Sequence, residues 1–125
     1  MTQTVPAVLL NDNNAEVLQY LAPLSCHGDN IESLLSYLSR YQDVHRFCPD
    51  ARNYRYFLWY TGDTIFAYGV GMSDVCLRIA DSETALAAEY ARDSRRLDGA
   101  CWLSFRYDCE QLENLARLAY MYAKS

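Results

Sequence analysis

The sequence predicts one α+β domain over residues 1–125, with an antiparallel sheet of about four strands that carries helices. Three observations lead to this class. Hydrophobic residues make up 51% of the chain, enough for a single core. Helical and strand periodicities occupy separate segments, in the order helix, helix, three strands, helix, strand, helix. Short glycine-containing turns join the three central strands, which predicts a β-meander.

Two helices are predicted before the sheet. In the segment 11–24, Asn13 is a candidate cap, Glu16 stands at the capping-box position and Pro23 ends the run. The second helix begins with the same spacing at Asp29 and Glu32. Its apolar stripe consists of Ile31, Leu34, Leu35, Leu38 and Tyr41. We expect this helix to end near Phe47, because Pro49 disfavours helical geometry at the residue before it.

The central strands are predicted at 54–60, 64–70 and 75–80, with the turns TGD and GMSD between them. A short helix follows within 81–96, with Asp81 or Ser82 as its cap. Gly99 then separates it from a fourth strand at 101–107.

A final helix is predicted after Asp108, which is the candidate cap, with Gln111 as its capping-box partner. The buried stripe of this helix consists of Leu112, Leu115, Ala116, Ala119 and Tyr122.

Both faces of the predicted sheet are apolar. Alternation along the strands assigns a core face to Leu58, Ile65, Val75, Leu77, Ile79, Leu103 and Phe105. The other face combines aromatic rings with arginines, namely Phe57, Trp59, Phe66, Tyr68 and Trp102 beside Arg55, Arg78 and Arg106. Three interpretations stay open for this second face: a core layer beneath the N-terminal helices, a homodimer or partner interface, or a pocket for a small anionic or aromatic ligand.

The net charge and the cysteine content limit the class of partner and the cellular compartment. A net charge of -5, from 16 acidic and 11 basic residues, disfavours nucleic acid as the main partner. The first residues form no signal sequence or membrane span, so we expect a cytoplasmic protein without membrane contact. The five cysteines are odd in number and form no CxxC pair, which favours reduced thiols.

Motifs for catalysis are weak. Cys26, His27, His45 and Cys48 form the one metal-like grouping, but their spacing matches no zinc module. A thiolate is disfavoured at Cys48 near a helix C-terminus, and Cys109 lies between two acidic residues. Four aspartates lie at positions where turns or helix caps favour this residue type, namely Asp50, Asp63, Asp74 and Asp81. We therefore predict no catalytic residue, metal or cofactor, and leave the enzyme question open.

One further charged segment is 91–99, which gathers Arg92, Arg95 and Arg96 near a predicted helix end. It is interpreted as a solvated patch, with contact to an anion or an acidic protein as the alternative.

Residues 54–123 resemble small bacterial proteins of the TfoX N-terminal and MmcQ/YjbR type. The resemblance rests on the order of elements in FLWYTGDTIFAYGVGMSDVCLRI and CWLSFRYDCEQLENLARLAYMYA. Trp102 and Tyr120 stand where that pattern has a Trp-bearing strand and an aromatic residue near the end of the last helix. The resemblance implies a hairpin-and-helix fold and no catalytic signature.

These observations give two functional hypotheses. The first is a non-enzymatic protein that self-associates or binds a protein partner through the aromatic sheet face. The alternative is a small-ligand binder or enzyme with a pocket between that face and the N-terminal helices, lined among others by Trp59, Arg78 and Trp102. The predicted ligand or partner residues are Phe57, Trp59, Phe66, Tyr68, Arg78, Trp102 and Arg106.

Overall fold

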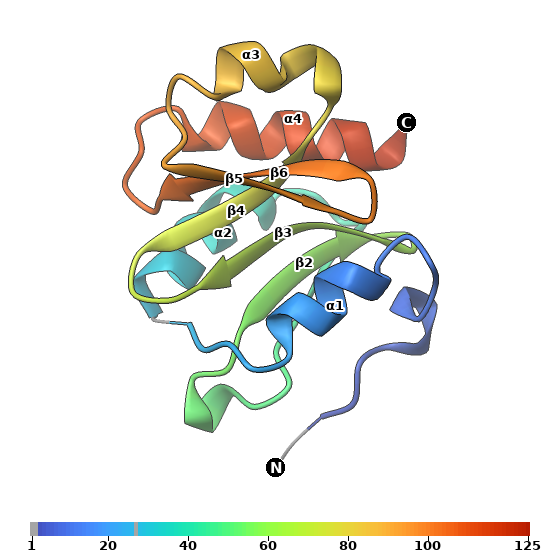
Figure 1. The fold of residues 1–125 in the computed structure, drawn as a ribbon. Helices are drawn as coiled ribbons and strands as arrows, with labels where there is room; N and C mark the ends of the chain where they lie inside the picture. The colour runs from blue at the N-terminus through green and yellow to red at the C-terminus, as the bar shows by residue number, and fades with distance from the viewer. Residues whose placement is uncertain (1–2, 27) are drawn as a thin grey trace.

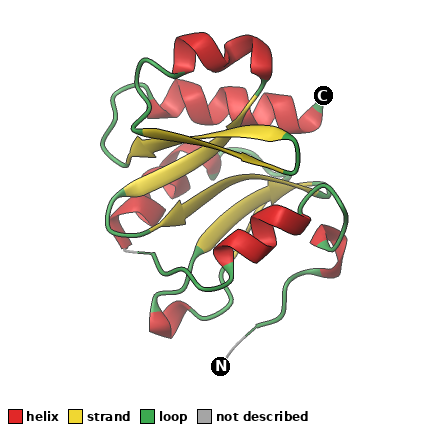
Figure 2. Cartoon of the chain, in the orientation of Figure 1, coloured by secondary structure: helices red, strands yellow, loops and turns green. Residues whose placement is uncertain are grey.

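A computed structural model describes residues 3–26 and 28–125 of the chain. It places helices on both faces of one antiparallel sheet, as Figures 1 and 2 show. In chain order, with η for a 3-10 helix, the elements are η1 (Ala7–Leu9), α1 (Ala15–Leu21), α2 (Gly28–Leu38), β1 (Val44–Phe47), η2 (Ala51–Asn53), β2 (Phe57–Thr61), β3 (Thr64–Val70), β4 (Asp74–Ile79), η3 (Asp81–Glu83), α3 (Thr84–Ala87), β5 (Asp93–Leu97), β6 (Ala100–Arg106) and α4 (Leu112–Lys124).

The described residues form a sheet of six strands in the order β1-β2-β3-β4-β6-β5, with every neighbouring pair antiparallel. The α+β class and the β2-β3-β4 meander are thus confirmed. The predicted count of about four strands is wrong, because both edge strands were assigned to helices. The second helix ends at Leu38 instead of near Phe47, and Val44–Phe47 pairs with β2. On the other edge, Asp93–Leu97 pairs with β6.

The β5-β6 hairpin has a turn signal that explains the second of these errors. Asp98 and Gly99 form its two-residue loop, with Leu97 opposite Ala100. Both loop residues have positive φ, 54° and 76°. This is the geometry of a type I′ turn, for which Asp-Gly is a preferred sequence. Because the turn fixes a strand on each side of it, the helix predicted within 81–96 contracts to η3 and the single turn of α3.

The core lies in two layers, one on each face of the sheet. On one face α2, α3 and α4 cover a cluster that includes Trp59, Phe66 and Phe105. On the other face η1, α1 and the chain around them cover a cluster that includes Tyr68 and Trp102. We call these the helix face and the α1 face. The predicted N-terminal helices therefore separate, with α2 on the helix face and α1 on the opposite one.

The predicted composition of the two faces is wrong for part of each set. Leu58 and Ile65 belong to the α1 face, whereas Trp59 and Phe66 lie on the helix face. A bulge explains Ile65 and Phe66: Trp59 pairs with Ala67 and Tyr60 with Ile65, so Phe66 has no partner on β2. Leu58 and Trp59 pair with Tyr68 and Ala67 before the bulge, so their faces follow from the register of β2 against β3. A bulge breaks simple alternation, so face assignment within each strand does not carry over to its neighbours.

Helix starts also differ from the predicted capping boxes. Asn14 rather than Asn13 is the N-cap residue of α1, and its side chain makes no capping bond. Instead, both carboxylate oxygens of Asp98 in the β5-β6 turn accept hydrogen bonds from the N–H groups of Glu16 and Val17, each at 3.0 Å. Glu16 accepts a bond in return from the N–H of Asp98 at 3.2 Å. The cap of α1 is thus supplied by a residue distant in sequence.

The predicted caps of the other long helices fare differently. α4 starts after Gln111, with no side-chain capping bond, and Asp108 accepts a bond from Nε of Arg106 at 2.8 Å instead. The Asp108 cap is therefore wrong. The side chain of Asp29, the predicted cap of α2, lies outside the described part of the structure.

The C-terminal helix is tied to the sheet by a polar latch formed by Asp43, Tyr120 and Lys124. The Tyr120 hydroxyl and the Lys124 ammonium donate to Asp43 at 2.6 and 2.7 Å. The Tyr120 ring stacks on Tyr41 with 4.1 Å between centroids. Hydrogen bonds from Lys124 and then Tyr120 lower the pKa of Asp43 from 3.8 to about 2. The latch thus favours the ionised carboxylate.

This pKa shift predicts a specific dependence of stability on pH. A folded-state pKa below the unfolded value adds stability above about pH 4, and that contribution disappears as pH falls through about 2. The melting-temperature difference between the unmodified protein and Asp43→Asn should therefore be constant near neutral pH and shrink between pH 4 and 2. Asp12→Asn, at an exposed position outside the latch, is the control. A difference that does not change with pH would contradict the ionised latch.

None of the helices within residues 3–26 and 28–125 combines the length and hydropathy that a membrane crossing requires.

Candidate functional site

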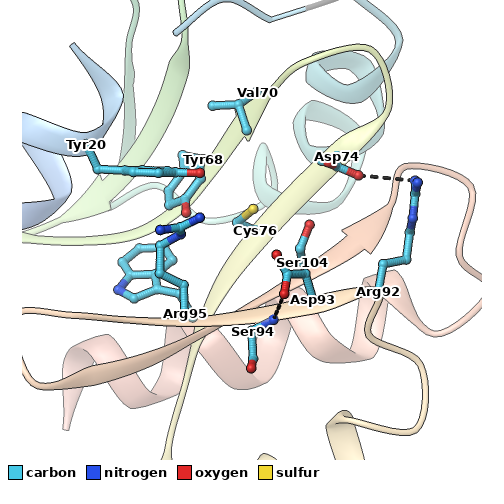
Figure 3. A pocket seen from close by; sticks show the side chains of 11 residues that line it. Tyr20, Tyr68, Val70, Asp74, Cys76, Arg92, Asp93, Ser94, Arg95 and Ser104 are labelled. Carbon is cyan, nitrogen blue, oxygen red and sulfur yellow. Dashed lines mark hydrogen bonds and ion pairs between the residues drawn. The ribbon is translucent and has the colours of Figure 1, made fainter. Parts of the chain in front are cut away.

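A cavity of about 260 Å³ opens between the α1 face of the sheet and Tyr20 of α1 (Figure 3). Register places one residue from each of four strands in a row along its floor. Tyr68 lies opposite Cys76, Cys76 opposite Ser104, and Ser104 opposite Asp93. Directly opposed residues of antiparallel strands share a face, so these four side chains extend toward the same side of the sheet. We call this space the α1 cavity.

The middle of the row consists of neutral polar groups. Tyr68 and Ser104 lie opposite Cys76 on the two neighbouring strands. Burial raises the pKa of Cys76 from 9.0 to about 11, and burial likewise raises the pKa of Tyr68 above its ordinary value. Both groups therefore keep their protons at neutral pH. A protonated thiol is a poor nucleophile, so this row serves for contact and hydrogen bonding rather than for covalent chemistry.

Aromatic rings form one wall of the cavity. The rings of Tyr68 and Trp102 lie 4.9 Å apart at 33°, and Tyr20 tilts toward Tyr68 at 6.0 Å. Tyr68 and Trp102 are each only 2% exposed. Within the described structure the Nε1 atom of Trp102 is buried and has no hydrogen-bond partner. A buried N–H without an acceptor is unfavourable by about 1–3 kcal/mol, which makes this group unusual in the wall of a cavity.

Charged groups stand around the opening. Arg92 is neutralised by Asp74 at 3.1 Å and also bonds to the Ser73 hydroxyl. Arg95 reaches from β5 toward Tyr20 and Tyr68, as Figure 3 shows, with its Cζ 4.3 Å from the Tyr20 ring centroid. Asp93 accepts a bond from the N–H of Ser94 at 2.8 Å. Among the described residues neither Arg95 nor Asp93 has an ion-pair partner, so one charge of each sign is left beside the cavity.

The structure divides the predicted site residues between the two faces. Tyr68 and Trp102 line the α1 cavity. The other three rings, Phe57, Trp59 and Phe66, belong to the helix face. Since Trp59 and Phe66 are 2% and 0% exposed, the predicted aromatic face is neither continuous nor open to solvent.

The two predicted arginines also lie apart from the cavity lining. Arg78 stacks its guanidinium over Tyr122 of α4 at 4.4 Å from the ring centroid. Arg106 is exposed, pairs with Asp108 and stacks on Tyr107. Of the predicted pocket residues, Arg78 lies directly opposite Trp102 across β4 and β6, but neither Arg78 nor Trp59 lines this cavity.

Sequence reasoning missed several cavity residues. Tyr20 and Asp93 were not singled out, and Cys76 was assigned no role. The charged segment that contains Arg92 and Arg95 is predicted near the end of a helix, whereas in the structure it belongs to β5 and the residue before it. The Asp98-Gly99 turn was the available signal, because a strand ending at Leu97 places Asp93 and Arg95 on one face.

Other groups offer less chemistry. Burial raises the pKa of Cys26 to about 12 and also raises that of Cys48, which follows β1 rather than a helix. A larger hollow, about 430 Å³, is lined by Ser25, Cys26, Tyr54, Gly71 and Met72, with no charged side chain. The described residues contain no cluster of three or more metal-ligating side chains, and His27 lies outside them.

Comparison with known proteins gives no match: no family model, no curated protein and no solved structure is similar to this chain. The resemblance to proteins of the TfoX N-terminal and MmcQ/YjbR type stays a prediction.

Proposed function

We propose that the protein binds a small organic molecule with a flat aromatic body in the α1 cavity. The observation that carries the proposal is at Trp102, which lines the cavity and whose buried indole N–H has no acceptor among the described residues. A ligand with a carbonyl or carboxylate oxygen would supply that acceptor. Its aromatic body would contact the rings of Tyr68 and Tyr20.

The cavity volume limits the ligand. At about 260 Å³ the space is slightly below the usual range of ligand pockets, roughly 300–1,000 Å³. A molecule with a single ring and a short polar substituent therefore fits better than a nucleotide or a coenzyme. For so small a ligand we expect dissociation constants in the micromolar to millimolar range.

The competing hypothesis, protein contact through the aromatic sheet face, has less support. It requires an exposed aromatic surface, whereas Tyr68 and Trp102 lie beneath α1 and Trp59 lies on the helix face. Self-association through another surface stays a prediction.

The two tryptophans of the chain allow a direct test, because they lie on opposite faces of the sheet. In Trp59→Phe the remaining indole is the one that lines the cavity. We expect benzamide, which has a carbonyl acceptor, to change the tryptophan emission of this variant in a saturable way. In Trp102→Phe the ring is kept but the N–H is lost, so calorimetry should show binding weakened by about fivefold to tenfold.

The two variants control for each other, since each replaces one buried tryptophan with phenylalanine. Benzamide affinity by calorimetry should be unchanged in Trp59→Phe. An equal loss in both variants would indicate a general effect on folding and contradict the assigned site. If benzamide, benzoate and L-phenylalanine all fail to bind the unmodified protein at about 10 mM, near the weak end of the expected range, the proposed function is rejected.

A further inference from the structure

We infer that the ligand of the α1 cavity is a zwitterion, an α-amino acid with an aromatic side chain. This inference rests on the proposed function and names the chemical class that the site would take. Its basis is the pair of charges left beside the cavity, the Arg95 guanidinium and the Asp93 carboxylate, neither of which has an ion-pair partner among residues 3–26 and 28–125.

The geometry of β5 brings these two charges to the same side. Asp93 and Arg95 are two residues apart on one strand, so they share a face and their Cα atoms are separated by about 7 Å. Register confirms the face independently, because Asp93 lies opposite Ser104 and Arg95 opposite Trp102. Both side chains line the cavity. A carboxylate and an ammonium group attached to the same carbon of one ligand would fit between them.

The other two charged lining groups add no net charge. Arg92 and Asp74 neutralise each other at 3.1 Å. The remaining balance is one positive and one negative group, so a ligand with only a carboxylate would gain from Arg95 and be repelled by Asp93. A ligand with only an ammonium group would be attracted by Asp93 and repelled by Arg95. A zwitterion gains at both positions, since each charge faces its opposite.

The aromatic part of the ligand follows from the rest of the wall. Trp102 is the strand neighbour of Arg95, and its ring lies 4.9 Å from that of Tyr68. A side-chain ring placed against these two would leave the amino and carboxylate groups at the β5 edge. There the carboxylate faces Arg95 and the ammonium group faces Asp93.

Three probes of similar size separate the possibilities: L-phenylalanine, 3-phenylpropionate without the amine, and phenethylamine without the carboxylate. Binding is measured at pH 7 by calorimetry and by the emission of Trp59→Phe. L-phenylalanine should bind about fivefold tighter than either analogue, the gain expected for a pair of solvent-exposed charges. In Arg95→Gln its affinity should fall to that of phenethylamine, and in Asp93→Asn to that of 3-phenylpropionate.

Arg96→Gln is the matched control, because it removes the same charge from the same strand at a residue that pairs with Asp81. It should leave L-phenylalanine binding unchanged. If 3-phenylpropionate or benzamide binds as tightly as L-phenylalanine and loses affinity in Trp102→Phe, the zwitterion inference is overturned and the proposed function stands. If none of these probes binds, both are rejected. Circular dichroism of each variant confirms that the fold is intact.

Discussion

Replacing Phe66 with alanine should lower the free energy of unfolding by about 3–5 kcal/mol, the loss typical of a fully buried aromatic side chain. Phe66 is 0% exposed and lies at the bulge of β3. Its ring meets the edge of Tyr120 on α4 at 6.0 Å between centroids. Truncation would leave a cavity where β3 contacts α4. The loss is the sum of the buried contacts removed and the cavity that remains after the surroundings relax.

Urea unfolding measures this change, with equal m values as the check that both proteins unfold the same surface. Met72→Ala is the control, because that side chain is 76% exposed and its truncation should change stability by about 0.5 kcal/mol or less. Phe66 was also a predicted binding residue. The folded fraction of Phe66→Ala should bind benzamide as the unmodified protein does, because the ring lies on the helix face. If Phe66→Ala destabilised the protein only weakly but no longer bound benzamide, Phe66 would be a binding residue after all.

Local signals were sufficient for the centre of the fold. The stripe of α2 predicts the burial of Leu34 and Leu38, and both are buried in the helix-face layer. The β2-β3 and β3-β4 turns have glycines with φ of 58° and 69°, as their tight geometry requires. These features depend on residues within a few positions of one another. The sequence alone is therefore sufficient to predict these local features.

The edges of the sheet were harder to predict, because an edge strand has weak periodicity of its own. β1 has four residues, of which His45 and Arg46 are exposed. Its identity as a strand depends on the partner β2, which lies beyond a turn and a 3-10 segment. In β5 the exposed charged residues conceal the alternation of polar and apolar residues by which a strand is recognised. Charged side chains are common on edge strands, where they oppose pairing with other chains, so the arginines did not argue for a helix.

The candidate site was only partly predictable, because it depends on register and on one long-range cap. Alternation was enough to select Tyr68 and Trp102 for a common face. The placement of Tyr20 across from them requires that α1 lie on that face, which Asp98 helps to fix through the first N–H groups of the helix. Asp93 entered the site through its pairing with β6. No spacing within the sequence encodes either relationship.

The second large effect is expected at Asn14, where alanine should lower the free energy of unfolding by about 2–4 kcal/mol. Asn14 is 1% exposed, and its amide links three backbone groups. Nδ2 donates to the carbonyls of Leu9 and Asp63 at 3.1 and 2.7 Å, and Oδ1 accepts from the N–H of Ile65 at 3.2 Å. Alanine would remove all three of these hydrogen bonds from a buried site, where water replaces them poorly. Asn11 would still donate to the carbonyls of Leu9 and Asp63, so the N–H of Ile65 and the lost amide contacts account for most of the effect.

Two further variants separate hydrogen bonding from shape. Asn13→Ala removes an exposed neighbouring amide and should change stability by about 0.5 kcal/mol or less. Asn14→Asp keeps the shape of the side chain but turns a charged oxygen toward the carbonyls that Nδ2 now serves. It should therefore destabilise at least as much as alanine at neutral pH in thermal unfolding. Tolerance of aspartate would contradict the hydrogen-bond explanation.

Asn14 also connects stability to the candidate site, because it holds the start of α1 against the β2-β3 turn while Tyr20 lies at the other end of the same helix. Loosening this end should allow α1 to leave the sheet in a fraction of molecules. The apparent affinity for benzamide then falls in proportion to the fraction in which the cavity is intact. Asn14→Ala should thus weaken binding even where the protein stays folded, and calorimetry well below the melting temperature would detect it. Unchanged affinity would mean that Asp98 alone is sufficient to hold α1 over the cavity.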